Sequence, residues 1–117
     1  MKFKSENTFI ERLEESTRIM NKYPGRIPII CEKANNNKNK DIPIIEKSKY
    51  LVPQDLTLSQ FLYVIRTKLK LPSEKAIFLI VGGRIPASTE LISNIYSRNK
   101  DFDGFLYITY SGENVFG

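Results

Sequence analysis

The residue types that most often carry out catalysis are nearly absent from the sequence. The chain contains no His, and Cys31 is its single Cys. Without a His there is no imidazole base for a Ser or Cys nucleophile, so Ser-His-Asp and Cys-His mechanisms are excluded within this chain. A structural zinc site, which takes several Cys or His ligands, is excluded as well. We therefore expect a protein that is not an enzyme and needs no cofactor or metal.

The single cysteine also bears on the cellular compartment. One Cys cannot form a disulfide within the chain, which favours a reducing, cytoplasmic environment. Cys31 lies among isoleucines, where a buried and inert thiol is more common than a reactive one. No apolar run is long enough for a membrane-spanning helix, and the N-terminus lacks the apolar core of a signal peptide. The sequence therefore predicts a soluble intracellular protein.

Composition and charge are those of one ordinary folded domain. The chain has 117 residues, of which 41% are hydrophobic and 26% charged, and this length is typical of a single domain. The formal net charge is +5, and residues 1–50 hold most of the excess, with 11 Lys or Arg against 7 Asp or Glu. A basic excess alone is weak support for nucleic-acid binding, and no helix-turn-helix, zinc finger or RNP-type motif is present. We expect no nucleic-acid partner.

Apolar spacing and turn signals predict the elements that must position any functional residues. Residues 2–6 can form one helical turn, and capping-box sequences that begin at Thr8 and Thr57 predict helices ending near residues 21 and 71. The predicted strands are 26–33, 48–52, 75–81 and 105–110, and a third full helix is predicted to begin at 88–90. Residues 35–41 are polar and of low complexity, which predicts a mobile loop.

This order of elements predicts an α+β domain of the β-grasp type. Two strands, a helix and two further strands can form a four-stranded mixed sheet over one helix, with the helices segregated to one face or one end. Pro28 has no N–H to donate to a strand ladder. We therefore expect the strand over 26–33 to lie at an edge or a bulge at that point.

The predicted helix after Thr57 carries more apolar residues than one core face needs. Phe61 and Val64 lie beside the core stripe and would stay partly exposed, which favours an interaction site over the alternative of packing under a loop. The core stripe itself is predicted to consist of Leu58, Leu62, Ile65 and Leu69.

Four separated motifs carry a resemblance to a known family. They are YPGRIPIICEKA at 23–34, KYLVPQDLT at 49–57, DGFLY at 103–107 and SGENVFG at 111–117. In this order they resemble the autophagy-related ubiquitin-like modifiers, the family of the GABARAP proteins and microtubule-associated protein light chain three. The resemblance covers essentially the whole chain. It implies a ubiquitin-like β-grasp with two additional N-terminal helices, organised as a helical extension (1–24), a β-grasp core (25–110) and a flexible conjugation tail (111–117).

The resemblance implies a role for the C-terminal residue. Members of the family are joined through a C-terminal Gly carboxylate to phosphatidylethanolamine on autophagosomal membranes, and Gly117 matches that Gly. A Gly has no side chain to crowd the carboxylate during adenylation and attack by enzyme thiolates. The sequence is consistent both with a precursor that continues past Gly117 and with a chain that ends there.

The same conjugation cycle implies a set of partners and a location. The expected partners are ubiquitin-like activating and conjugating enzymes, a processing or deconjugating cysteine protease, and the phosphatidylethanolamine membrane. The expected location is the cytoplasm, and the autophagosome membrane after lipid conjugation. A ubiquitin-like adaptor in vesicle trafficking or cytoskeletal attachment that is never conjugated is the alternative function.

Family members also capture Trp/Phe/Tyr-x-x-Leu/Ile/Val peptides from cargo receptors and other autophagy factors. The expected mechanism is addition of the peptide as a strand beside residues 49–51. The resemblance implies an aromatic-anchor set made of Glu15, Ile19, Pro28, Ile30, Lys49, Leu51 and Phe105. It implies an aliphatic-anchor set made of Tyr50, Val52, Leu56, Phe61 and Val64.

Two further groups of residues are implied beside these sets. Arg26, Lys47 and Lys49 would attract the acidic residues that flank such peptides, tuning rate and selectivity more than affinity. Phe78 and Ile80 match a second surface that binds helical ubiquitin-interacting motifs, with the sheet core as the alternative location for either side chain.

Overall fold

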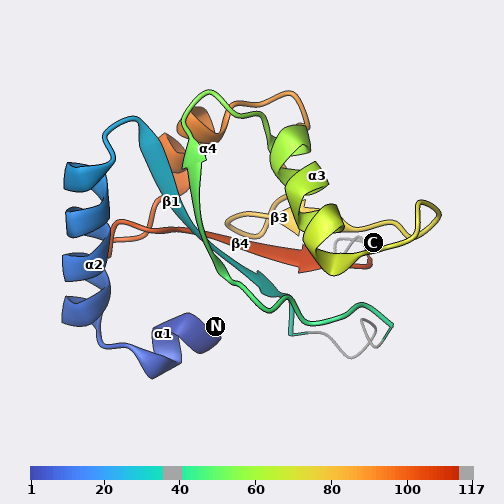
Figure 1. Cartoon of the computed structure of the whole chain (residues 1–117), viewed down its shortest axis with the longest axis horizontal. Helices are drawn as coiled ribbons and strands as arrows, with labels where there is room; N and C mark the ends of the chain where they lie inside the picture. The colour runs from blue at the N-terminus through green and yellow to red at the C-terminus, as the bar shows by residue number, and fades with distance from the viewer. Residues whose placement is uncertain (36–40, 114–117) are drawn as a thin grey trace.

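The computed structural model describes residues 1–35 and 41–113, and this part of the chain forms four helices and four strands (Figure 1). In chain order they are α1 (Lys2–Glu6), α2 (Phe9–Lys22), β1 (Arg26–Lys33), β2 (Lys49–Pro53), α3 (Leu58–Leu69), β3 (Phe78–Ile80), α4 (Ile92–Asn99) and β4 (Leu106–Ser111). The order agrees with the prediction. No helix in the described ranges has both the length and the apolar character needed to cross a membrane.

The strands form one mixed sheet in the order β2-β1-β4-β3. β1 pairs antiparallel with β2 and parallel with β4, while β3 pairs antiparallel with β4. The predicted four-stranded mixed β-grasp is therefore confirmed, and β2 and β3 are its two edge strands. β4 includes Ser111, one residue of the segment that the family resemblance places in the tail.

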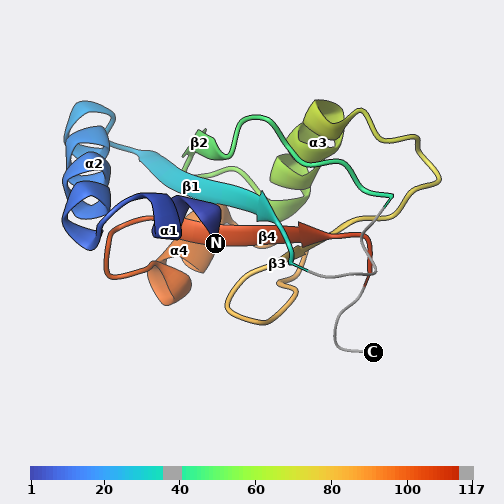
Figure 2. The same cartoon turned by 90° about the horizontal axis from the view of Figure 1, so that it is seen from below.

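Helices cover both faces of this sheet, so the expected segregation to one face or end is wrong. Successive strand side chains point to opposite faces. Ile29, Cys31 and Ile108 join the main core with α3 and α4, and we call this side the α3 face. α1 lies on the other side, which we call the α1 face (Figure 2). There the ring of Phe3 in α1 lies 5.2 Å from that of Phe105. The physical reason is that β1 and β4 are apolar on both sides and need cover on each.

Both predicted capping boxes are present. In α2, the Thr8 side chain accepts from the Glu11 N–H at 3.1 Å, and Glu11 accepts from the Thr8 N–H at 2.7 Å. Thr57 and Gln60 exchange the same pair of bonds at the start of α3. These contacts join residues three positions apart, so the local sequence suffices to predict them.

Residues 88–90 do not begin a helix, contrary to the prediction. α4 begins at Ile92 and has no side-chain cap. Instead, the carbonyls of Ser88 and Glu90 each accept a 2.9 Å hydrogen bond, from the N–H groups of Ser59 and Leu58 respectively. These backbone contacts satisfy donors in the first turn of α3, which no helical carbonyl can reach.

The third predicted strand is also shorter than expected, with residues 78–80 in place of 75–81. Before it, the carbonyl of Lys75 accepts from Arg66 Nη1 at 2.6 Å. After it, Val81 pairs with Arg84 across the tight Gly82–Gly83 turn. Arg66 and the turn therefore delimit β3 at its two ends.

The sequence predicts that the first strand lies at an edge or a bulge at Pro28, and the pairing there agrees with an edge. It is opposite Leu51 of β2, whereas pairing of β1 with β4 begins only at Ile29 and Leu106. At Pro28, β1 is therefore paired on one side, and the missing N–H leaves no gap in a ladder.

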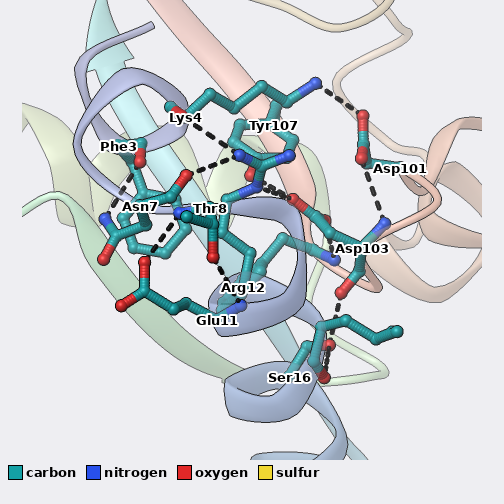
Figure 3. Close-up of polar contacts among 12 residues, drawn as sticks. Phe3, Lys4, Asn7, Thr8, Glu11, Arg12, Ser16, Asp101, Asp103 and Tyr107 are labelled. Carbon is teal, nitrogen blue, oxygen red and sulfur yellow. Dashed lines mark hydrogen bonds and ion pairs between the residues drawn. The ribbon is translucent and has the colours of Figure 1, made fainter.

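A buried carboxylate connects α2 to the turn before β4 (Figure 3). The Asp103 side chain is fully buried and accepts from Arg12 Nε at 2.8 Å, from the Phe105 N–H at 2.9 Å and from the Tyr107 hydroxyl. The Ser16 hydroxyl donates to the Asp103 backbone carbonyl. Burial raises the pKa of Tyr107, and the hydrogen bond to Asp103 raises it further.

The same network reaches α1. Arg12 Nη1 donates to the carbonyls of Lys4 and Asn7 at 3.1 and 2.8 Å, and Lys4 forms an ion pair with Asp101 at 2.6 Å. At the start of α1, the N–H groups of its first two residues donate to the Glu32 carboxylate of β1 at 2.9 and 3.0 Å. α1 has five residues, too few for a helix that is stable alone, so these contacts hold it in place.

We predict that Asp103→Ala lowers the free energy of unfolding by about 3–5 kcal/mol, because it leaves the largely buried Arg12 guanidinium without its counter-charge. Urea denaturation of the purified chain measures the change. Asp55→Ala, which removes an exposed Asp in the turn after β2, is the matched control and should cost less than about 1 kcal/mol. Equal effects of the two substitutions would contradict the structural role of Asp103.

Candidate functional site

The free edge of β2 offers backbone groups for an added strand. Cys31 donates to the Ser48 carbonyl at 2.7 Å, and Gln54 donates to the Gly25 carbonyl at 3.0 Å. Hydrogen-bonded pairs alternate with non-bonded pairs along an antiparallel ladder. The N–H and C=O groups of Lys49 and Leu51 therefore point outward, away from β1.

The aromatic-anchor set lies on the α1 face beside this edge. Its floor is fully or nearly fully buried, its wall is on α2 and its half-buried rim is on β2. Two contacts join the three parts: Lys49 forms an ion pair with Glu15, and Leu51 lies opposite Pro28. The floor is Pro28, Ile30 and Phe105, the wall is Glu15 and Ile19, and the rim is Lys49 and Leu51.

Phe3, which the sequence analysis missed, covers part of this floor. Its ring is edge-on to Phe105, and the Lys49 ammonium lies 5.5 Å from its centroid. Lys49 therefore contacts both Phe3 and Glu15. The available signal was that Phe3 is the one apolar residue in the predicted turn at 2–6, where it must face the protein if the turn is to bury anything.

The aliphatic-anchor set lies on the opposite side of β2, on the α3 face. Tyr50 and Val52 of β2 are buried in the main core, and the Tyr50 ring is edge-on to Phe61 of α3 with centroids 5.6 Å apart. Leu56 and Val64 are partly buried and pack against the same core. The exposed surface of the set is thus provided by Leu56 and Val64.

The prediction that Phe61 stays partly exposed is wrong. Phe61 is completely buried, and Leu62, predicted to be in the core, is half-buried. The aromatic ring buries more apolar area than a leucine and gains an edge-to-face contact with Tyr50, which favours this rotation of the helix. The buried stripe of α3 is Leu58, Phe61, Ile65 and Leu69.

The three basic residues predicted to contact acidic flanks lie around this edge and already have partners. Arg26 Nη1 donates to the outward-facing Leu51 carbonyl at 3.3 Å. The Lys47 ammonium lies 5.5 Å from the centroid of the Tyr50 ring, and Lys49 is paired with Glu15. An acidic peptide would therefore exchange contacts with these side chains.

The remaining predicted site residues lie elsewhere. Phe78 is half-buried and Ile80 buried, and both lie on β3 facing away from Leu79, which belongs to the main core. Gly117 is outside the described residues, as is most of the predicted loop at 35–41.

Acidic and cysteine side chains are the remaining candidates for metal binding, and the single cysteine lies in the core. No group of three or more Cys, Asp or Glu side chains in residues 1–35 and 41–113 could hold a metal ion. Cys31 is fully buried, and burial, with a smaller effect of Glu32, raises the pKa of its thiol. Two sets of mainly apolar side chains beside an unpaired strand edge are suited instead to binding an extended peptide.

The fold and this edge are those of a ubiquitin-like protein, and comparison with known sequences assigns the family. The model of the family described as "Autophagy protein Atg8 ubiquitin like" matches residues 11–117. Autophagy-related protein 8 of Mycosarcoma maydis is 57% identical over 98% of this chain and 95% of its own length. Autophagy-related protein 8e of Arabidopsis thaliana is 56% identical over 98% and 92%. The chain belongs to the Atg8 family of ubiquitin-like autophagy proteins.

Solved structures agree with this assignment. Trypanosoma brucei ATG8 has a TM-score of 0.88 and 40% identity, covering 95% of this chain and 93% of that one. Plasmodium falciparum Atg8, solved in complex with a Plasmodium falciparum Atg3 peptide, has a TM-score of 0.86 and 35% identity, covering 96% of each chain.

The buried hydroxyl of Tyr50 provides a test of the packing in the aliphatic-anchor set. This hydroxyl has no hydrogen-bond partner among the described residues, and burial raises the pKa of Tyr50 to about 12. We predict that Tyr50→Phe leaves the free energy of unfolding unchanged or raises it by about 1 kcal/mol, because no hydrogen bond is lost.

Tyr110→Phe is the matched control for this substitution. The Tyr110 hydroxyl accepts from the Ile45 N–H at 2.8 Å and donates to the Pro43 carbonyl at 2.7 Å. Its removal should cost about 1–3 kcal/mol, measured by urea denaturation of both variants. If Tyr50→Phe were as destabilising as Tyr110→Phe, the Tyr50 hydroxyl would have to be paired.

Proposed function

We propose that this chain binds Trp/Phe/Tyr-x-x-Leu/Ile/Val peptides of cargo receptors and autophagy factors by strand addition to β2. The observation that carries the proposal is that the two anchor sets lie on opposite faces of the sheet, on either side of one free strand edge. Lys49 and Leu51 provide the backbone groups with which the peptide would pair, and Arg26, Lys47 and Lys49 are the contacts for its acidic flanks.

The positions of the two sets account for the anchor spacing. In an extended peptide, residues i and i+3 differ by an odd number of positions, so their side chains point to opposite faces. The aromatic side chain would enter on the α1 face and the aliphatic one on the α3 face. The aliphatic-anchor set extends beyond Val52 to Leu56, toward the C-terminal end of β2. A peptide whose aromatic anchor precedes its aliphatic anchor in sequence would therefore run parallel to β2.

Entry of the aromatic anchor requires side chains at the rim to move. Phe3 lies over Phe105, and Lys49 spans Phe3 and Glu15. Lys49 is about two-fifths exposed and forms one ion pair among the residues that the structure describes, which would cost little to exchange for an acidic residue of the peptide. The aliphatic anchor would rest on the partly exposed Leu56 and Val64.

We further propose that the carboxylate of Gly117 is joined as an amide to the amine of phosphatidylethanolamine on autophagosomal membranes. The family assignment and the match of the C-terminal motif support this role. The chain would then be a substrate of its activating and conjugating enzymes and of a deconjugating protease, without catalytic residues of its own. The peptide complex of the Plasmodium falciparum relative supports binding of an Atg3-type peptide.

We predict that anchor spacing controls peptide affinity. A peptide with Trp and Leu three positions apart should bind at least about tenfold more tightly than peptides with spacings of two or four, because an even spacing leaves one anchor unburied. Titration of labelled peptides with the full chain, followed by fluorescence anisotropy, measures the dissociation constants. Equal affinity for all three spacings would contradict entry of the anchors on opposite faces.

We predict that Gly117 is required for lipid conjugation. Incubation of the chain with the cognate activating and conjugating enzymes, ATP and phosphatidylethanolamine liposomes should add the mass of one lipid, whereas Gly117→Ala should remain unchanged. Intact-mass spectrometry reads out both reactions. If the chain binds anchor peptides but gains no mass, the conjugation proposal is wrong and the alternative function, an adaptor that is never conjugated, is favoured.

A further inference from the structure

In the free chain, the floor of the aromatic-anchor set is closed. Ile30 and Phe105 have no exposed surface, and Pro28 beside them is buried. An aromatic side chain of a peptide can therefore reach this floor only if a group that now covers it leaves. The half-buried ring of Phe3 is one such group, because it lies edge-on to Phe105 with the ring centroids 5.2 Å apart.

Phe3 makes with the floor the kind of contact that an aromatic anchor of a peptide would make. An edge-on pair of aromatic rings buries apolar area and adds an electrostatic attraction of its own. At the rim, the Lys49 ammonium lies 5.5 Å from the Phe3 centroid and adds a cation–π contact. A Trp, Phe or Tyr anchor offers the same two interactions, so Phe3 and the anchor are chemically equivalent occupants of one surface.

α1, which carries Phe3, is held by polar contacts and by this one ring, and none of its residues is fully buried. The N–H groups of Lys2 and Phe3 donate to the Glu32 carboxylate at 2.9 and 3.0 Å. Lys4 forms an ion pair with Asp101 in which both side chains are partly exposed, and such pairs contribute little. Local opening of so weakly held an element costs less than global unfolding.

We propose that α1 is an internal competitor of the peptide: Phe3 occupies the aromatic-anchor site in the free chain and leaves it when the aromatic side chain of the peptide enters. Residues 1–6 then detach from the sheet, while α2, joined to it through Arg12 and Asp103, remains as the wall. This inference rests on the proposed peptide binding and adds a control to it. Any change that releases α1 raises the apparent affinity for peptides, because a larger fraction of the chain is ready to bind.

The substitution Phe3→Ala tests the proposal, because it removes the competing ring and leaves both anchor sets unchanged. We expect the full-length variant to bind a Trp-x-x-Leu peptide with uncharged flanks about threefold to tenfold more tightly than the wild-type chain does. A peptide with Ala in place of Trp should gain nothing, because it does not enter the site that Phe3 leaves. NMR titration of the labelled chain measures each dissociation constant. Phe102→Ala, which removes a ring that is 94% exposed, is the matched control and should leave both affinities unchanged.

Glu32→Ala releases α1 by a different route and keeps the Phe3 ring, so it decides the same question if Phe3→Ala does not fold. It removes the carboxylate that accepts from the first two N–H groups of α1, and the Trp peptide should again bind more tightly. Glu14→Ala, which removes an exposed carboxylate from α2, is its control. In the wild-type chain, nuclear Overhauser contacts between the rings of Phe3 and Phe105 should disappear as the Trp peptide saturates the site.

The outcomes separate this inference from the peptide binding on which it rests. With anchor-dependent binding intact, an unchanged or weaker affinity of Phe3→Ala for the Trp peptide would overturn the competitor alone. A gain of equal size for the Ala peptide would do the same, as would ring contacts between Phe3 and Phe105 that persist in the saturated complex. If replacing both anchors by Ala does not weaken binding to the wild-type chain, the proposed groove fails and the competitor fails with it.

Discussion

The carboxylate of Asp103 is the point at which the N-terminal helices are joined to the sheet. α1 has no fully buried residue and Ser16 is the one in α2, so apolar contacts such as that of Phe3 with Phe105 hold this extension only in part. Polar contacts add to them: Asp103 neutralises Arg12, and Arg12 in turn binds two carbonyls of the α1 region. Because α2 is one wall of the aromatic-anchor set and Phe3 of α1 covers its floor, this buried pair helps to hold both helices against that set.

The parts of the fold that could be predicted from sequence are those set by neighbours in the chain. The capping boxes at Thr8 and Thr57 and the one-sided pairing at Pro28 depend on residue chemistry within a few positions, and all three are present. The predicted helix start at 88–90 failed because carbonyls there accept from α3, a contact between segments about thirty residues apart in sequence. Helical periodicity likewise identified a stripe on α3 but could not choose between Phe61 and Leu62, since the choice depends on contact with Tyr50.

The same distinction applies to the candidate site. The family resemblance supplied both anchor sets by position, and β2 and its neighbours bring the members of each set to one side of the sheet. It did not reveal that Phe3 lies over Phe105 or that Lys49 is already paired with Glu15. These contacts join segments that no local pattern relates. They matter for the proposed peptide binding because the free chain presents a covered floor, so part of the binding free energy would go to moving side chains that are already in contact.

The form of the β2 edge explains why the proposed peptide would need two anchor side chains. An unpaired edge invites association with any extended chain, and proteins limit this with short edge strands, charged side chains and prolines. β2 has all three features: five residues, Lys49 on its edge and Pro53 at its end, with the Arg26 guanidinium on the Leu51 carbonyl. Backbone pairing at Lys49 and Leu51 can therefore set the register of a bound peptide but contributes little affinity. In the proposed complex, affinity would have to come from side chains buried on the two faces, so selectivity would follow from which faces of the peptide are apolar and how its anchors are spaced.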